Sequence, residues 1–150
     1  MSVQGGKHAW WPKTLTSLLR CLAGYLLASA IAGIIQVAFV LPPLDLAASG
    51  SDRWMAAGIW MLLAASHSGI FGAPVAIAAL AIAEWKGIYR PAYYVATGLS
   101  IAAAGFLAQL SSAQQSIGVS LYVLAALSTA GASAGFVYWL ASGRRAGKWR

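Results

Sequence analysis

Apolar residues fall into four long runs along this chain, and short polar segments separate them. The runs cover about residues 13–41, 54–84, 92–110 and 117–141. A helix needs about 20 apolar residues to cross the hydrocarbon core of a bilayer, and each run meets or nearly meets that length. The pattern therefore predicts an all-α membrane protein in which residues 1–150 form one domain, an antiparallel bundle of four transmembrane helices.

The second run is longer than a single span requires. At 1.5 Å per residue a helix of this length extends about 45 Å, whereas the hydrocarbon core is about 30 Å thick. Such a helix must tilt, kink or extend beyond the bilayer. Pro74 lies inside the run. It lacks the N–H that a helix interior uses and clashes with the carbonyl four residues earlier, so we predict a kink near this residue.

The first run also has one feature of a secretion signal. Ala28-Ser29-Ala30 imitates the small-residue cleavage site of a signal peptide. However, the apolar sequence continues to Leu41 and ends only at Pro42 and Pro43, as in a membrane anchor. We therefore interpret the first run as an uncleaved transmembrane helix.

The basic residues are distributed unevenly between the two sides of the predicted bundle. Four spans place both termini on one side, together with nine basic residues: Lys7, Lys13, Arg20, Lys86, Arg90, Arg144, Arg145, Lys148 and Arg150. Only Arg53 lies on the other side. Because basic residues concentrate in cytoplasmic segments, we predict a cytoplasmic tail at 1–12, a basic cytoplasmic tail at 142–150, and both termini in the cytoplasm.

The composition excludes an ordinary soluble domain. Hydrophobic residues make up 60% of the chain and charged residues 9%, whereas a typical globular chain is roughly 25% charged. The mean hydropathy is +0.72 and the net charge is +7. Since the basic residues flank apolar runs rather than forming one patch, we expect the lipid bilayer and anionic lipid headgroups as partners, and no nucleic acid.

One titratable residue, His67, lies near the middle of an apolar run. A charge at that depth costs at least about 2.5 kcal/mol, which makes an intramembrane histidine a candidate functional group. The simpler alternative is a neutral imidazole that is hydrogen-bonded to a hydroxyl or to a carbonyl of the kink. The candidate polar site combines this residue with neighbouring and facing side chains: His67, Ser66, Ser68, Gln36, Ser128 and Thr129.

No set of residues in the sequence supports catalysis or cofactor binding. One buried histidine cannot supply both axial ligands of a transmembrane haem, and the single cysteine, Cys21, excludes an intrachain disulfide or a thiolate metal cage. The three carboxylates lie at helix ends or in loops. A serine adjacent to His67 on a helix does not face it. We therefore expect no catalytic residue, no metal and no cofactor, and a protein that is not an enzyme.

Small residues spaced four positions apart predict close helix packing. These pairs are Gly131 with Gly135, Ser68 with Gly72, and Gly69 with Ala73. Such spacing lets the backbones of two helices approach closely. It predicts contact with another helix of this chain or with a helix of a partner.

Two short motifs mark the second half of the chain, from Glu84 onward. Tyr93 and Tyr94 stand at the start of the third run, and the sequence FVYWLASGRRAG covers residues 136–147. In these motifs and in its four-span layout the chain resembles small four-helix inner-membrane proteins of proteobacteria. The resemblance implies a location in the bacterial inner membrane, and it assigns no catalytic or binding residue.

Together these features predict a non-enzymatic accessory or packing subunit of an inner-membrane complex, associated with other membrane subunits or with itself. The alternative is a homo-oligomeric transporter or channel for a small solute, with the kinked second helix lining the path. The two hypotheses differ in one structural expectation, because a transporter requires its polar residues to converge on one cavity. Those residues are Gln36, His67, Ser128 and Thr129.

Overall fold

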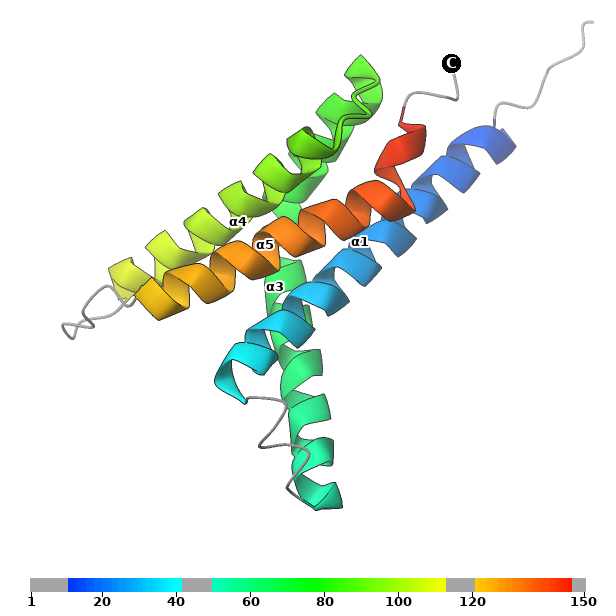
Figure 1. Cartoon of the computed structure of the whole chain (residues 1–150). Coiled ribbons are helices and arrows are strands. Elements are labelled where there is room, and N and C mark those ends of the chain that lie inside the picture. Colours follow the sequence, from blue (N-terminus) through cyan, green and yellow to red (C-terminus); the bar gives the residue numbers. More distant parts are fainter. Residues whose placement is uncertain (1–10, 42–49, 113–120, 147–150) are drawn as a thin grey trace, which may run out of the picture.

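The computed structural model describes residues 11–41, 50–112 and 121–146, and these residues form four long helices joined by short connections (Figure 1). The helices are α1 (Trp11–Val40), α3 (Ser51–Lys86), α4 (Pro91–Ser112) and α5 (Leu121–Ala141), followed by the short 3-10 helix η1 (Gly143–Arg145). All four long helices are long and apolar enough to cross a membrane. The predicted all-α fold with four such helices is confirmed.

The helix boundaries differ from the predicted ones by a few residues. The helix α3 extends into the polar residues at both ends, so it is 36 residues long. It ends at Gly87, whose φ of 64° is left-handed and whose N–H bonds the carbonyl of Ala83. Glycine adopts that conformation without steric cost, which makes it a favoured helix terminator. The fourth helix begins at Leu121, and residues 117–120 of its predicted range lie outside the described residues.

The four helices pack in the order α4, α5, α1, α3, and the first and last members of that order contact each other less than the neighbouring pairs do. In Figure 1, α4, α5 and α1 lie roughly side by side in one layer, and α5 runs in the opposite direction to both neighbours. The helix α3 crosses behind this layer obliquely. The bundle is therefore open on the side between α3 and α4.

The α4–α5 interface depends on contact between two backbones. A Cβ atom added to Gly131 would lie 2.9 Å from the Cβ of Ala102 and 3.0 Å from the carbonyl carbon of Gly98. A Cβ on Gly135 would lie 2.8 Å from the carbonyl carbon of Tyr94. Real Cβ atoms do not approach so closely, so these positions require glycine. The G-x-x-x-G pair of α5 is thus used inside the chain, against α4.

The contacts of α1 follow the same rule on two of its faces. A Cβ on Gly33 would lie 2.6 Å from the carbonyl oxygen of Met61 and 2.8 Å from the Cβ of Ala65, both on α3. A Cβ on Gly24 would lie 3.1 Å from the Cβ of Ser142, just after α5. Small residues therefore allow α1 to contact both neighbours closely, as in other membrane helix pairs.

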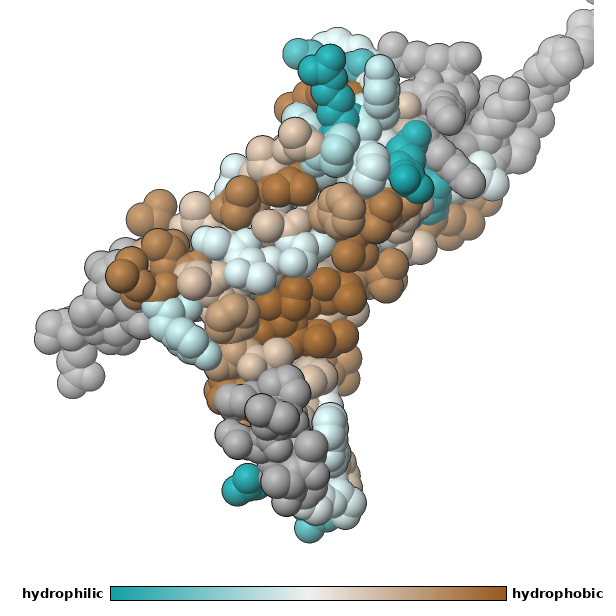
Figure 2. Space-filling view, in the orientation of Figure 1, coloured by the Kyte–Doolittle hydropathy of each residue, from teal (hydrophilic) through white to brown (hydrophobic). Residues whose placement is uncertain are grey.

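Small side chains and two tyrosines form the core, whereas the large aliphatic side chains point outward. The buried cluster contains Ala28, Ala83, Tyr94 and Tyr138. Figure 2 shows hydrophobic residues over the middle of the visible face, with hydrophilic residues gathered at its upper end and at the lower tip of α3. An apolar exterior with polar ends is the distribution that a bilayer favours.

We predict that Gly98→Leu separates α4 from α5. The added side chain must displace the Gly131 backbone, and overpacking of this kind costs about 1–3 kcal/mol. The measurement is unfolding in mixed detergent and denaturant, followed by circular dichroism. Gly58→Leu is the matched control, because a Cβ at Gly58 meets nothing within 4 Å. Equal stability of the two variants would contradict the close contact.

Candidate functional site

All four helices contribute to a partly open cleft of about 440 Å³ inside the bundle. Its walls come from residues 25–36 of α1, 67–80 of α3, 94–108 of α4 and 127–138 of α5. Most of the lining side chains are small or apolar. A volume of this size lies within the range of about 300–1,000 Å³ that is usual for small-molecule sites.

Three of the predicted polar residues, Gln36, His67 and Ser68, line the cleft together with other polar side chains such as Ser29 and Thr97. The Nε2 of Gln36 donates a hydrogen bond of 2.8 Å to the Oγ of Ser68, which joins α1 to α3. His67 also lines the cleft, and its ring stacks on Phe71 with 6.3 Å between the centroids and 12° between the planes. Three of the candidate polar residues therefore lie at one place. Within the described residues, the imidazole has a ring contact rather than the hydroxyl or carbonyl partner that we anticipated.

The other three candidate polar residues lie elsewhere. Ser66 is exposed and its hydroxyl donates to the carbonyl of Leu62 in the preceding turn. Thr129 is exposed and its hydroxyl donates in the same way to the carbonyl of Ala125. Neither these two residues nor Ser128 is among the residues that line the cleft. Of the six residues in the predicted polar site, three therefore line the cleft and three do not.

The turn that contains Gly69, Gly72 and Pro74 forms part of the contact of α3 with its neighbours. The hydroxyl of Tyr25 donates to the carbonyl of Gly69, and a Cβ on Gly69 would lie 3.2 Å from the Oγ of Ser29. Gly72 is buried, and a Cβ there would lie 3.1 Å from the Cγ2 of Ile101. Pro74 is itself exposed inside a continuous helix. The two glycines thus bring α3 close to α1 and α4.

One end of the cleft is closed by two aromatic rings. Tyr94 and Tyr138 are 3% and 6% exposed, and their ring centroids lie 5.5 Å apart. The hydroxyl of Tyr94 donates a 2.8 Å hydrogen bond to the carbonyl of Ile88, which anchors the α3–α4 connection. This end is therefore apolar inside and hydrogen-bonded only at its rim.

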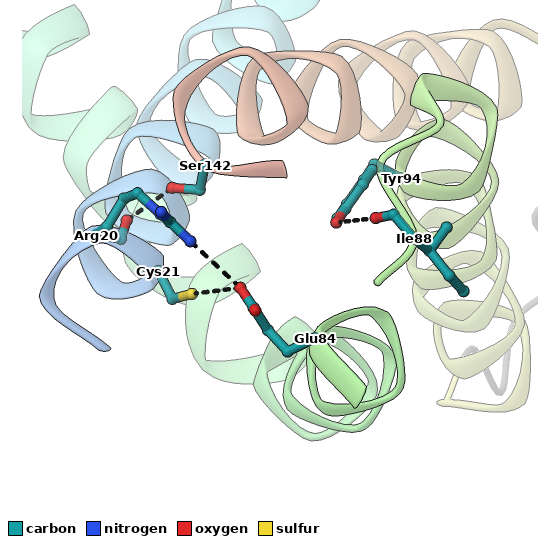
Figure 3. A network of polar contacts seen from close by, with 6 residues as sticks. All are labelled: Arg20, Cys21, Glu84, Ile88, Tyr94 and Ser142. Atoms are coloured by element: carbon teal, nitrogen blue, oxygen red, sulfur yellow. Dashed lines mark hydrogen bonds and ion pairs between the residues drawn. The ribbon is translucent and has the colours of Figure 1, made fainter. Parts of the chain in front are cut away.

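Beyond the tyrosines, a polar network joins the ends of three helices (Figure 3). The Nη2 of Arg20 and the Oε1 of Glu84 form an ion pair at 3.4 Å between α1 and α3. The Sγ of Cys21 lies 3.7 Å from the same oxygen as a weak donor, and the hydroxyl of Ser142 donates 2.7 Å to the carbonyl of Arg20. Within the described residues, the buried Nε of Arg20 has no hydrogen-bond partner. The network therefore joins α1 to the end of α3 and to the residue that follows α5.

Sequence reasoning missed two of these contacts. Glu84 is the single acidic residue among the basic helix ends on its side, and that isolation was the available signal for an ion pair with a neighbouring helix. A tyrosine such as Tyr25 inside an apolar run needs a partner for its hydroxyl, because buried tyrosine hydroxyls are usually hydrogen-bonded. Neither signal identifies the partner, since that depends on which helices are neighbours.

The cleft offers hydrogen bonding, apolar contact and one imidazole, that of His67. Among the described residues, no three histidine, cysteine or carboxylate side chains gather as a metal site. The one imidazole at the cleft is placed beside an amide and a hydroxyl, not beside a carboxylate. Comparisons with protein-family models, with curated proteins and with solved structures found no match to this chain.

We predict that Glu84→Ala lowers the free energy of unfolding by about 1–2 kcal/mol, between the values for exposed and fully buried ion pairs. The loss arises because Arg20 is left half-buried without its counterion. The charge-swapped double variant Arg20→Glu with Glu84→Arg should regain at least half of that loss. Unfolding titrations of the three chains measure both effects, and a double variant less stable than Glu84→Ala would argue against the pair.

Proposed function

We propose that this chain is a four-span protein of the bacterial inner membrane with both termini in the cytoplasm. In this role it is a non-enzymatic accessory or packing subunit of a membrane complex. The location is supported by the resemblance to small proteobacterial inner-membrane proteins. The orientation is supported by charge, because the polar network places the start of α1 and the ends of α3 and α5 at the end of the bundle that carries Lys86, Arg90 and Arg144.

The membrane setting also accounts for the oblique course of α3. Its apolar part, residues 54–83, is about 45 Å long and exceeds a hydrocarbon core of about 30 Å. A helix that is too long relieves the mismatch by tilting or bending. The crossing of α3 behind the other helices supports a tilt, and Pro74 supplies the place at which we propose a bend.

One observation carries the proposed role as a subunit: α3 buries only small residues and exposes its large ones. Its buried residues are Ala57, Gly72, Ala76 and Ala83. Its exposed apolar residues include Trp54, Ile59, Trp60, Leu62, Ile70 and Ile77. The longest helix of the chain thus contacts the rest along one narrow face, and most of its circumference is available to another subunit.

The transporter alternative is favoured by one observation and opposed by another. Gln36, Ser68 and His67 do converge on a cleft that α3 lines, as a solute path would require. However, Ser128 and Thr129 lie away from it, and most of the cleft wall is apolar. A polar solute would lose its hydration there without finding replacement partners, which costs several kcal/mol per unsatisfied group. Packing is therefore the better supported role.

We predict that a photo-crosslinking residue at Ile59 or Ile77 of α3 yields one discrete protein adduct in native membranes. Both positions point outward, at 56% and 67% exposure. Leu107 of α4 is equally exposed and serves as the matched control, for which only lipid adducts are expected. Mass spectrometry identifies the adduct. A dimer of this chain, of twice 15.6 kDa, would instead favour the homo-oligomeric alternative, and lipid adducts at all three positions would contradict a subunit role.

His67→Ala separates the two functional hypotheses. For a packing subunit we expect no solute flux through reconstituted vesicles of either chain. We also expect a change in unfolding free energy below about 1 kcal/mol, because the contact of the imidazole within the described part of the chain is its stacking on Phe71. Flux in the parent chain that disappears in His67→Ala would overturn the packing role. The measurement is uptake of small fluorescent solutes into vesicles, with protein-free vesicles as the baseline.

A further inference from the structure

We infer that the cleft between α3 and α4 is a binding site for one hydrocarbon chain of an anionic membrane phospholipid. This inference goes beyond the subunit role and rests only on the proposed membrane-spanning arrangement. Three properties of the cleft support it: its width, its side opening and the charge beside it.

The cleft is long and narrow. Its wall on α4 runs from Tyr94 to Ala108, and its wall on α3 from His67 to Leu80, which corresponds to a length of about 20 Å. A volume of about 440 Å³ spread over that length corresponds to a narrow space rather than to a wide chamber. A helix with side chains is about 10 Å wide and does not enter. A single hydrocarbon chain does, because carbon atoms contact one another at about 4 Å.

The cleft also opens in the right direction for a lipid. The helices α3 and α4 contact each other less than every pair of neighbours in the packing order does. They meet where Gly72 lies against Ile101 and where the hydroxyl of Tyr93 donates a 2.8 Å hydrogen bond to the carbonyl of Ala79, and the cleft lies beside these contacts. Since both helices are candidate membrane spans, the opening between them faces the bilayer interior rather than water. Lipid chains therefore enter the cleft from the side. A hydrocarbon chain packs against alanine, glycine and isoleucine residues of the wall and brings no polar group that would be left unpaired.

The charge beside the opening matches an anionic headgroup. The connection between α3 and α4 lies at one end of the opening, and it is flanked by Lys86 and Arg90, both exposed. Lys86 lies six residues beyond Leu80, and Arg90 lies four residues before Tyr94, which places both backbones within about 10 Å of the end of the cleft. Because Tyr94 and Tyr138 close this end of the cleft, a lipid whose chain enters from the side keeps its phosphate outside the two rings, beside the connection, and each basic residue near the membrane surface attracts anionic lipid.

Gly105 provides the variant that tests the site. It lines the cleft, and a Cβ there meets nothing within 4 Å, so larger side chains enter the empty volume without displacing a neighbour. Gly58 is the matched control, because it is equally unobstructed but does not line the cleft. The full chain is purified in mild detergent, stripped of lipid and titrated with phosphatidylglycerol or phosphatidylcholine, and bound lipid is counted by native mass spectrometry.

The site predicts one tightly bound phosphatidylglycerol per chain. Affinity should be retained in Gly105→Ala and fall in the order Gly105→Leu, Gly105→Phe, by at least tenfold in the last, while the same series at Gly58 has no effect. Lys86→Gln and Arg90→Gln should each reduce the preference for phosphatidylglycerol over phosphatidylcholine by about fivefold. Equal binding by Gly105→Phe and the parent chain would overturn the site, as would a dimer that Gly105→Phe abolishes, because a second copy would then be the occupant.

A measurement on the unaltered chain tests the site without relying on variants that could misfold. Phosphatidylglycerol with a photoactivatable group midway along one acyl chain should cross-link to cleft residues such as Gly72, Ile101 and Gly105. Cross-links confined to outward residues such as Ile77 and Leu107 would overturn the inference. This outcome is distinguishable from failure of the subunit role, since the adducts from outward positions on α3 report protein partners and not lipid in the cleft.

Discussion

The backbone contact between Gly98 and Gly131 is the constraint on which the arrangement of the helices depends. It holds α4 and α5 at a separation that no side chain permits, and Gly135 extends the same contact toward Tyr94. The other side of α5 is then left for α1, whose own glycine at position 33 admits α3. Small residues thus allow close contact at each of the three main interfaces, and α1 uses them toward both of its neighbours. The fourth side of the bundle, between α3 and α4, has fewer contacts, such as that of Gly72 with Ile101.

The open side determines what the interior can do. A closed bundle of these helices would fill its centre with alanine and glycine contacts, but the limited contact between α3 and α4 leaves a cleft whose walls are mostly small or apolar, with a few polar side chains among them. Two of those polar groups bond each other, the amide of Gln36 and the hydroxyl of Ser68. The side chains that carry charge in the described residues lie at the ends of the helices instead. Recognition of apolar molecules, rather than chemistry on polar ones, is the property that this distribution favours.

The sequence alone was sufficient to predict where the helices lie along the chain, but not which faces of the helices contact one another. Runs of apolar residues with prolines and glycines at their ends define helices locally, and the four helices were found within a few residues of their predicted bounds. Which side chains meet across the interior depends instead on rotation and order of packing, which small residues on several faces leave undetermined. His67 and Ser128 were therefore expected together but lie apart, and the ion pair of Arg20 with Glu84 was not anticipated. For Gln36, the sequence predicted that its amide needs a partner within the protein, but it did not identify Ser68 as that partner.

The short connection between α3 and α4 fixes the two helices to each other at one end. Residues 87–90 and the bond from Tyr94 to Ile88 hold the two helices together at one end, whereas their far ends have no such tie within the described residues. The two helices therefore form the arms of a hinge, with the cleft between them. A helix that is longer than the bilayer is thick changes its inclination when the bilayer becomes thinner or thicker. For the membrane-spanning arrangement that we propose, we expect the angle between these two helices, and with it the volume of the cleft, to change with the thickness of the bilayer.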